Sequence, residues 1–232
     1  ENAIIYLTLA NCLIHQVNKN AITIAEDMSG MPGLAAPIDE EGIGFDFRMS
    51  MGVPDYWIKL VSDQRDEDWH VGDLFYQMTN KRDDEHTISY AESHDQALVG
   101  DKTLIFRMVD KEMYTSMSVF EQNMVVDRGI ALHKMIRLLT ITTAGDGYLN
   151  FMGNEWGHPE WIDFPREGNN WSYEHARRQW HLMEDPTLRY HFLNDFDKAM
   201  LKLVKREKIF RYPSIPMVRD NERQVLIFSR GD

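Results

Sequence analysis

Short β-rich runs alternate with helical patterns along this chain, and this alternation limits the possible folds more than any other feature. The runs lie at residues 21–25, 43–48, 87–92 and 148–152, with helical patterns at 2–17, 51–60 and 127–143. Nearly continuous apolar strands that alternate with helices are typical of a parallel sheet covered on both faces. The sequence therefore predicts an α/β fold built from four βα-type units.

Polar or ionisable residues stand at the C-terminal end of every run. Doubly wound sheets and (β/α) barrels both fit the alternation, but a barrel carries its functional site at the C-terminal ends of its strands. We therefore favour a barrel. Four units make only half of a closed barrel, and an open half would leave parallel edges unpaired. We expect the remaining strands to precede Glu1.

The domain organisation follows from the same pattern. Residues 1–210 are expected to form the half-barrel, with the charged, helix-rich segment 171–208 packed on its exterior. Residues 211–232 are expected to be a linker and the first strand of a truncated C-terminal β domain, because 225–228 is a continuous β-prone run.

The composition limits the kinds of molecule that the chain is expected to bind. The 25 basic and 37 acidic residues give a formal net charge of −12, which works against binding to nucleic acid or to anionic membranes. Cys12 is the single cysteine, so no disulfide can form within the chain and a cytoplasmic location is expected. His133 and His175 lack the spacing of metal ligands, and we expect neither a metal nor a cofactor.

Two of the strand ends carry groups suited to acid–base chemistry. Glu26 and Asp27 follow the first run, and His94 and Asp95 follow the third. Taken singly, each pair is also explained by contacts that stabilise a loop. Together they lie on strands separated by one other strand, where Glu26 and Asp95 could approach the same substrate atom. Two close carboxylates favour protonation of one of them, as a general acid requires.

Five long segments resemble, in order, the eukaryotic glycogen and starch branching enzymes of the α-amylase superfamily. These segments are residues 23–34, 42–60, 90–103, 127–140 and 147–182. The short loop at 165–171 is more similar to the glycogen-type members than to the plant starch-type ones. The resemblance implies that the four runs are strands 5 to 8 of a (β/α)8 TIM barrel.

The resemblance also implies roles and a substrate. Glu26 matches the proton donor, Asp95 the third carboxylate that grips sugar hydroxyls, and His94 a substrate-binding histidine of an α-glucan transferase. Further substrate contacts are expected from four residues near the strand ends: Asp27, Met28, Gln96 and Asn154. The residues Asp146 and Trp156 stand where glutamate and phenylalanine are expected in the family.

The family's nucleophilic aspartate has no counterpart in these 232 residues, since it would lie upstream of the helix at 2–17. A glucosyl-enzyme intermediate requires that carboxylate. We therefore expect the isolated chain to be inactive, and the N-terminal half of the barrel to be its partner.

Two other interpretations remain open at this point. One is an amylase-like or debranching hydrolase that uses the same carboxylates, and the other is a non-catalytic fragment that binds glucan or protein. Trp156, Trp161 and Trp171 could stack on sugar rings, although burial in the protein interior is the commoner role of tryptophan.

Overall fold

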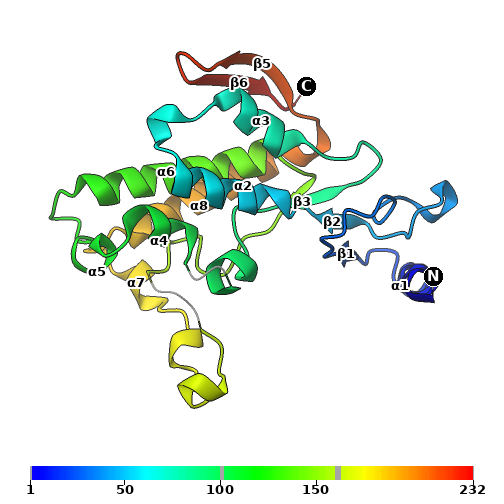
Figure 1. The fold of residues 1–232 in the computed structure, drawn as a ribbon, viewed down its shortest axis with the longest axis horizontal. Coiled ribbons are helices and arrows are strands. Elements are labelled where there is room, and N and C mark those ends of the chain that lie inside the picture. Colours follow the sequence, from blue (N-terminus) through cyan, green and yellow to red (C-terminus); the bar gives the residue numbers. More distant parts are fainter. Residues whose placement is uncertain (1, 100–101, 160–162, 232) are drawn as a thin grey trace.

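Four parallel strands form the central sheet of the computed structural model, which describes residues 2–99, 102–159 and 163–231 (Figure 1). The strands follow one another in sequence order: β1 (Ile24–Ala25), β2 (Phe47–Met49), β3 (Thr87–Ser89) and β4 (Gly147–Tyr148). Parallel pairing joins Ala25 to Arg48, Arg48 to Thr87, and Ser89 to Tyr148. The predicted α/β class and four parallel strands are therefore confirmed.

The hydrogen-bonded strands are shorter than the β-prone runs, and the fourth lies earlier than expected. We predicted a strand over 148–152, but pairing with β3 is confined to Gly147 and Tyr148. The backbone of Leu149 still donates to the Ser89 carbonyl, and the chain then turns through Gly153, whose φ is +108°. This φ suits glycine and ends the extended path.

Helices beside the sheet supply most of the main core (Figure 1). They are α2 (Gly52–Asp63), α3 (Val71–Thr79), α4 (Leu104–Val109), α5 (Glu112–Thr115), α6 (Met124–Thr143), α7 (His181–Glu184) and α8 (Tyr190–Glu207). The long α6 begins at Asn123, whose side chain accepts from the backbone N–H groups of Val125 and Val126. Its Ile136 packs in one cluster with Trp57 of α2. Helix α6 thus joins the elements that follow the second and third strands.

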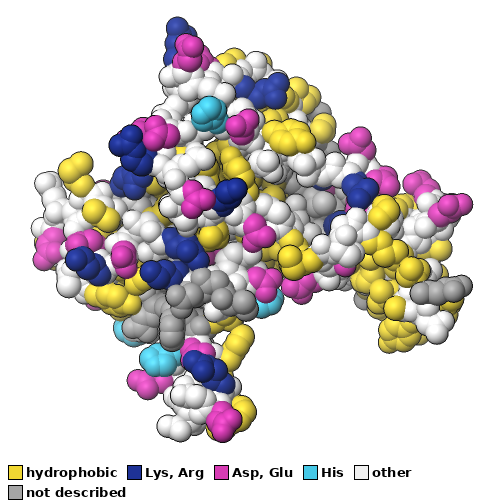
Figure 2. All heavy atoms as spheres, in the orientation of Figure 1, with side chains coloured by type: hydrophobic (Ala, Val, Ile, Leu, Met, Phe, Trp, Pro, Cys, Tyr) yellow, Lys and Arg dark blue, Asp and Glu magenta, His cyan; other side chains and the backbone are white. Residues whose placement is uncertain are grey.

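The predicted helix at 2–17 is present as α1 (Asn2–Val17), but its apolar residues do not enter this core. Ile5, Leu9 and Leu13 are 52%, 63% and 61% exposed. In Figure 2, apolar side chains gather at the end of the molecule where α1 lies. Only Asn11 of this helix is buried, and its amide donates to the Ile43 carbonyl at 3.1 Å.

The C-terminal segment is an antiparallel hairpin, β5 (Ile215–Asp220) and β6 (Val225–Ser229), rather than a single strand. The strand β5 was missed because it contains Pro216. Proline has no backbone N–H to donate, so its presence in a short segment usually argues against a strand. The structure accommodates it beside a register shift between Pro216 and Val218. The hairpin lies over α3 (Figure 1), where Phe75 and Phe228 have ring centroids 6.0 Å apart.

Within the part of the chain that the structure describes, every helix is too short or too polar to cross a membrane.

Candidate functional site

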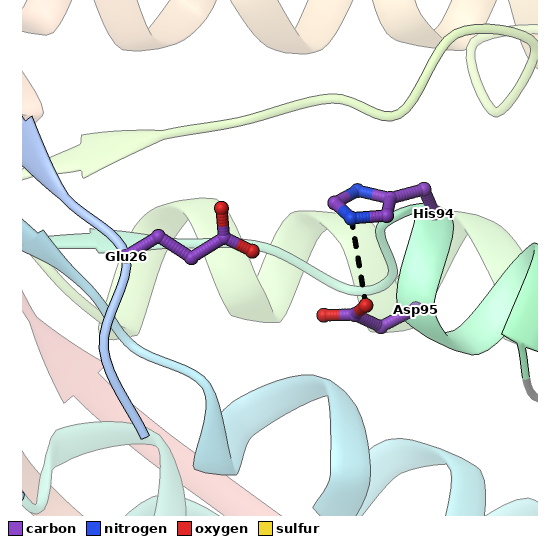
Figure 3. A group of neighbouring side chains, drawn as sticks. All are labelled: Glu26, His94 and Asp95. Atoms are coloured by element: carbon purple, nitrogen blue, oxygen red, sulfur yellow. Dashed lines mark ion pairs between the residues drawn. The ribbon is translucent and has the colours of Figure 1, made fainter. Parts of the chain in front are cut away.

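Glu26, His94 and Asp95 converge at the C-terminal edge of the sheet (Figure 3). One carboxylate oxygen from each acid and one ring nitrogen of His94 all lie within 4.8 Å of one another. His94 Nε2 lies 3.4 Å from Asp95 Oδ1. The predicted meeting of Glu26 with Asp95 is therefore found, across the strand that separates their own two strands.

The cluster is open to solvent. Glu26 and His94 are exposed and Asp95 is partly buried, so all three polar groups can reach a ligand. Carboxylates and imidazole are also ligands for a divalent cation. They equally supply what sugar chemistry needs: a proton donor, and acceptors for hydroxyl groups.

A chain of hydrogen bonds fixes the first turn of the short π-helix η3 (Asp95–Val99), which carries Asp95 and directly follows His94. The backbone N–H of Asp95 donates to Ser93 Oγ at 3.2 Å, and Ser93 Oγ donates to Gln96 Oε1 at 3.1 Å. Gln96 Nε2 in turn donates to Asp55 Oδ1 of α2 at 3.0 Å. The buried Gln96, predicted to bind substrate, therefore has its amide engaged in holding this turn. Sequence reasoning missed Ser93 and Asp55, which lie on separate elements.

Asp27 is likewise held by protein groups. Its carboxylate accepts from Ser29 Oγ at 2.8 Å and from Arg48 Nη2 at 3.3 Å. The Ser29 hydrogen bond is the main cause that lowers the pKa of Asp27, and the Arg48 charge contributes. The substrate-binding role predicted for Asp27 thus competes with a role in its own loop.

Tyr90 is buried one residue past β3, near enough to Asp95 and Glu26 for their charges to act on it. Burial raises the pKa of its hydroxyl, and the negative charges of Asp95 and Glu26 raise it further. A neutral phenol there adds no negative charge to a site that already holds two acids.

The remaining residues that could contact a sugar differ in how exposed their side chains are. Asn154 is buried, and its side chain forms a hydrogen bond with Glu92. Met28 is 78% exposed, just beyond Glu26. Trp156 is fully buried, as expected for a packing residue, whereas Trp171 is 66% exposed. Trp161 lies outside the described residues.

Glu92 is a fully buried acid between β3 and the turn of His94. Its Oε2 accepts from the backbone N–H of Leu104 at 2.6 Å, which ties the strand end to the start of α4. Burial raises the pKa of Glu92 to about 7, although the Leu104 and Asn154 hydrogen bonds and the charges of Arg107 and Arg137 favour the carboxylate.

This buried acid predicts a pH-dependent contribution to stability. The pKa of Glu92 is about 7 in the folded protein against 4.5 for a free side chain, so the folded state binds more protons between these values. The contribution of Glu92 to the free energy of unfolding is therefore full below about pH 4.5 and is lost as pH rises through 7. Glu92→Gln is expected to gain thermal stability relative to wild type between pH 5 and pH 8.

Thermal unfolding midpoints of both proteins across this pH range test the prediction. The exposed Glu222→Gln is the matched control, and its difference from wild type is expected to stay constant. A Glu92→Gln difference that is equally constant with pH would contradict the assignment.

Comparison with known proteins places this chain in a family. No family model matches the chain. It is 54% identical, over its whole length, to a protein of Rhizophagus irregularis named 1,4-alpha-glucan-branching enzyme, of which it covers 34%. Proteins with the same name from Felis catus and Solanum tuberosum are 61% and 53% identical over 89% and 100% of the chain, which covers 30% and 27% of them.

The chain spans about a third of the length of these curated relatives. The matches include both strand ends that supply the converging side chains, since they run over all or nearly all of this sequence. From this similarity we conclude that the chain belongs to the 1,4-α-glucan-branching enzyme family.

Proposed function

We propose that this chain supplies part of the catalytic domain of an enzyme that cuts an α-1,4 glucan bond and rejoins the freed chain through an α-1,6 bond. The observation that carries this proposal is the convergence of Glu26, His94 and Asp95 at the C-terminal edge of a parallel sheet. Relatives that match the whole chain carry the name of a branching enzyme, which supports transfer over hydrolysis.

In the proposed reaction, Glu26 protonates the glycosidic oxygen as its bond to the anomeric carbon breaks. The same residue later takes the proton from the incoming 6-hydroxyl group. Asp95 and His94 hold sugar hydroxyls and favour the oxocarbenium-like transition state. The nucleophile of this retaining double displacement is proposed to be a carboxylate outside these 232 residues.

Features of the N-terminal region support a partial barrel. In the part of the chain that the structure describes, β1 pairs only with β2, so its other edge is available to a further strand. The apolar residues of α1 are exposed beside it, as expected of a helix that packs on further βα units. We propose that β1 to β4 are strands 5 to 8 of a (β/α)8 barrel, and that upstream strands of the same protein complete it.

The remaining parts of the proposal concern organisation and location. Residues 1–210 are assigned to the catalytic domain, and 211–232, which contain the hairpin, to the start of a C-terminal β domain. A cytoplasmic enzyme acting on glycogen or a similar α-glucan fits the single, unpaired Cys12 and the acidic net charge.

Product analysis of a full-length protein that contains this chain tests the proposed reaction. With amylose, the iodine colour is expected to fall while the number of reducing ends stays constant, because transfer forms one glycosidic bond for each one broken. Hydrolysis would create a reducing end with every cut. A rise in reducing ends that parallels the loss of colour would replace the transferase with an amylase-like hydrolase.

The 232-residue chain alone is the companion sample. We expect no loss of iodine colour over time, because the proposed nucleophile is not among its residues. Time-dependent loss of colour with the purified chain would contradict the proposed division of the catalytic groups. Glucan binding without any reaction in the full-length protein would favour a non-catalytic role.

A further inference from the structure

Arg48 of β2 joins the loop that follows β1 to the segment that precedes β3. Its Nη1 donates to Glu85 Oε2 at 2.8 Å and to the Met31 carbonyl at 2.8 Å, and its Nη2 donates to Asp27 Oδ2 at 3.3 Å. The Arg48 side chain is 10% exposed and that of Glu85 is 1% exposed. Such a desolvated, forked arrangement restricts geometry more than a surface ion pair does.

The register of the sheet places this guanidinium directly beside the backbone that carries Glu26. Arg48 pairs with Ala25, the residue that precedes Glu26. Because side chains alternate along an extended chain, Ala25 and Asp27 share the face of Arg48, while Glu26 lies on the opposite face. Arg48 therefore binds Asp27, the residue after Glu26, on one face of the extended chain. On the opposite face, the Glu26 side chain points toward His94 and Asp95 (Figure 3).

A second cation holds the same loop. Arg82 Nη2 donates to the Gly30 carbonyl at 2.9 Å, and its Nε lies 3.8 Å from Glu85 Oε2. Glu85 Oε1 also accepts from the backbone N–H of Ala35 at 3.5 Å. The loop after β1 is thus attached at several points to one buried carboxylate that precedes β3.

We propose that Arg48 is a positioning residue for Glu26, which it sets in place by holding Asp27 and the Met31 carbonyl against the buried Glu85. This inference rests on the proposed role of Glu26 as proton donor. It also assigns Asp27 to loop geometry instead of to substrate binding. Displacement of a reacting group by about 1 Å can cost on the order of 10²-fold in rate, so the effect falls on kcat.

Steady-state kinetics of Arg48→Gln and Arg48→Lys in the full-length protein test the proposal. Arg48→Gln is expected to lower kcat by about 10- to 100-fold with KM within about threefold of wild type, because substrate contacts are unchanged. The kcat of Arg48→Lys is expected to lie between those of wild type and Arg48→Gln. An ammonium group can pair with Glu85 but cannot bind all three acceptors in a planar fork.

Removal of Arg48 leaves the buried Glu85 with the more distant Arg82, at 3.8 Å, so loss of folding must be separated from loss of positioning. The double variant Arg48→Gln with Glu85→Gln removes both charges and is expected to recover thermal stability but not kcat. Recovery of both would show a merely structural ion pair and overturn the proposal. Arg128→Gln, which removes an ion pair with Asp66 far from this loop in the sequence, is the matched control and is expected to keep wild-type kcat.

Asp27→Asn and Glu26→Gln separate the remaining outcomes. Asp27→Asn is expected to lower kcat with little change in KM, and a selective rise in KM would return Asp27 to substrate binding and overturn its assignment here. Wild-type kcat in the Arg48 variants, with an inactive Glu26→Gln, would overturn the positioning role alone. An active Glu26→Gln would overturn the proposed function and this inference with it.

Discussion

Replacement of Glu26 by glutamine is expected to lower kcat for glucan transfer by about 10²- to 10⁴-fold, the usual contribution of a general acid–base group. The amide keeps the size and hydrogen-bonding shape of the side chain but cannot give up a proton at neutral pH. KM is expected to change little, because the lost interaction acts on the departing oxygen in the transition state. Initial rates on amylose measure both quantities.

The leaving group provides an internal check on this assignment. Fluoride departs without protonation, so with α-maltosyl fluoride as donor the Glu26→Gln variant is expected to lose far less of its rate of fluoride release in the first turnover, before an acceptor hydroxyl has to be deprotonated. Glu222→Gln, an exposed acid in the turn of the C-terminal hairpin, is expected to match wild type on both donors. Equal losses on amylose and on the fluoride would assign Glu26 to binding or folding instead of to proton transfer.

Replacement of Asp197 by alanine is expected to have the largest effect on stability. Asp197 of α8 forms an ion pair with Arg137 of α6, whose side chain is fully buried. Loss of Asp197 leaves a buried guanidinium without its ion-pair partner, and breaking a buried pair in this way commonly costs about 3–5 kcal/mol of unfolding free energy. Hydrogen exchange of the α6 backbone amides measures this locally, because core helices report the larger opening free energies.

Asp195, an exposed acid that lies on α8 like Asp197, is the control for that experiment. Asp195 lies 4.0 Å from Lys198, and both side chains are more than half exposed. Asp195→Ala is expected to change the free energy by less than about 1 kcal/mol, the usual range for surface ion pairs. Similar exchange rates in the Asp195 and Asp197 variants would show that the α6–α8 ion pair contributes little.

Features with a local or periodic signature could be predicted from the sequence. The helices α1 and α6 follow from apolar spacing, and the parallel strand order follows from the alternation of strands with helices. The convergence of Glu26 and Asp95 was predicted from a general rule, that parallel strands end at one edge of their sheet. The catalytic roles of these residues remain predictions.

Contacts between distant segments could not be predicted in the same way. No local pattern shows that Gln96 reaches Asp55 on α2, or that Arg48 reaches Glu85. Which residues meet in these contacts depends on how far each strand extends at its C-terminal end and on the path of the loop that connects it to the next element. The strand β5 was missed for another reason, since Pro216 gave a misleading local signal that pairing with β6 overrides.

The position of β2 between β1 and β3 determines how far apart the Glu26 and Asp95 side chains lie. The two loops that carry Glu26 and Asp95 start about 9.5 Å apart, twice the usual distance between neighbouring strands, and their side chains close the remaining gap. The middle strand therefore acts as a spacer, and its width and twist set the separation of Glu26 and Asp95. Substitution of Phe47 or Met49, which flank Arg48 in β2, would therefore be expected to change the separation of the two carboxylates without replacing either of them.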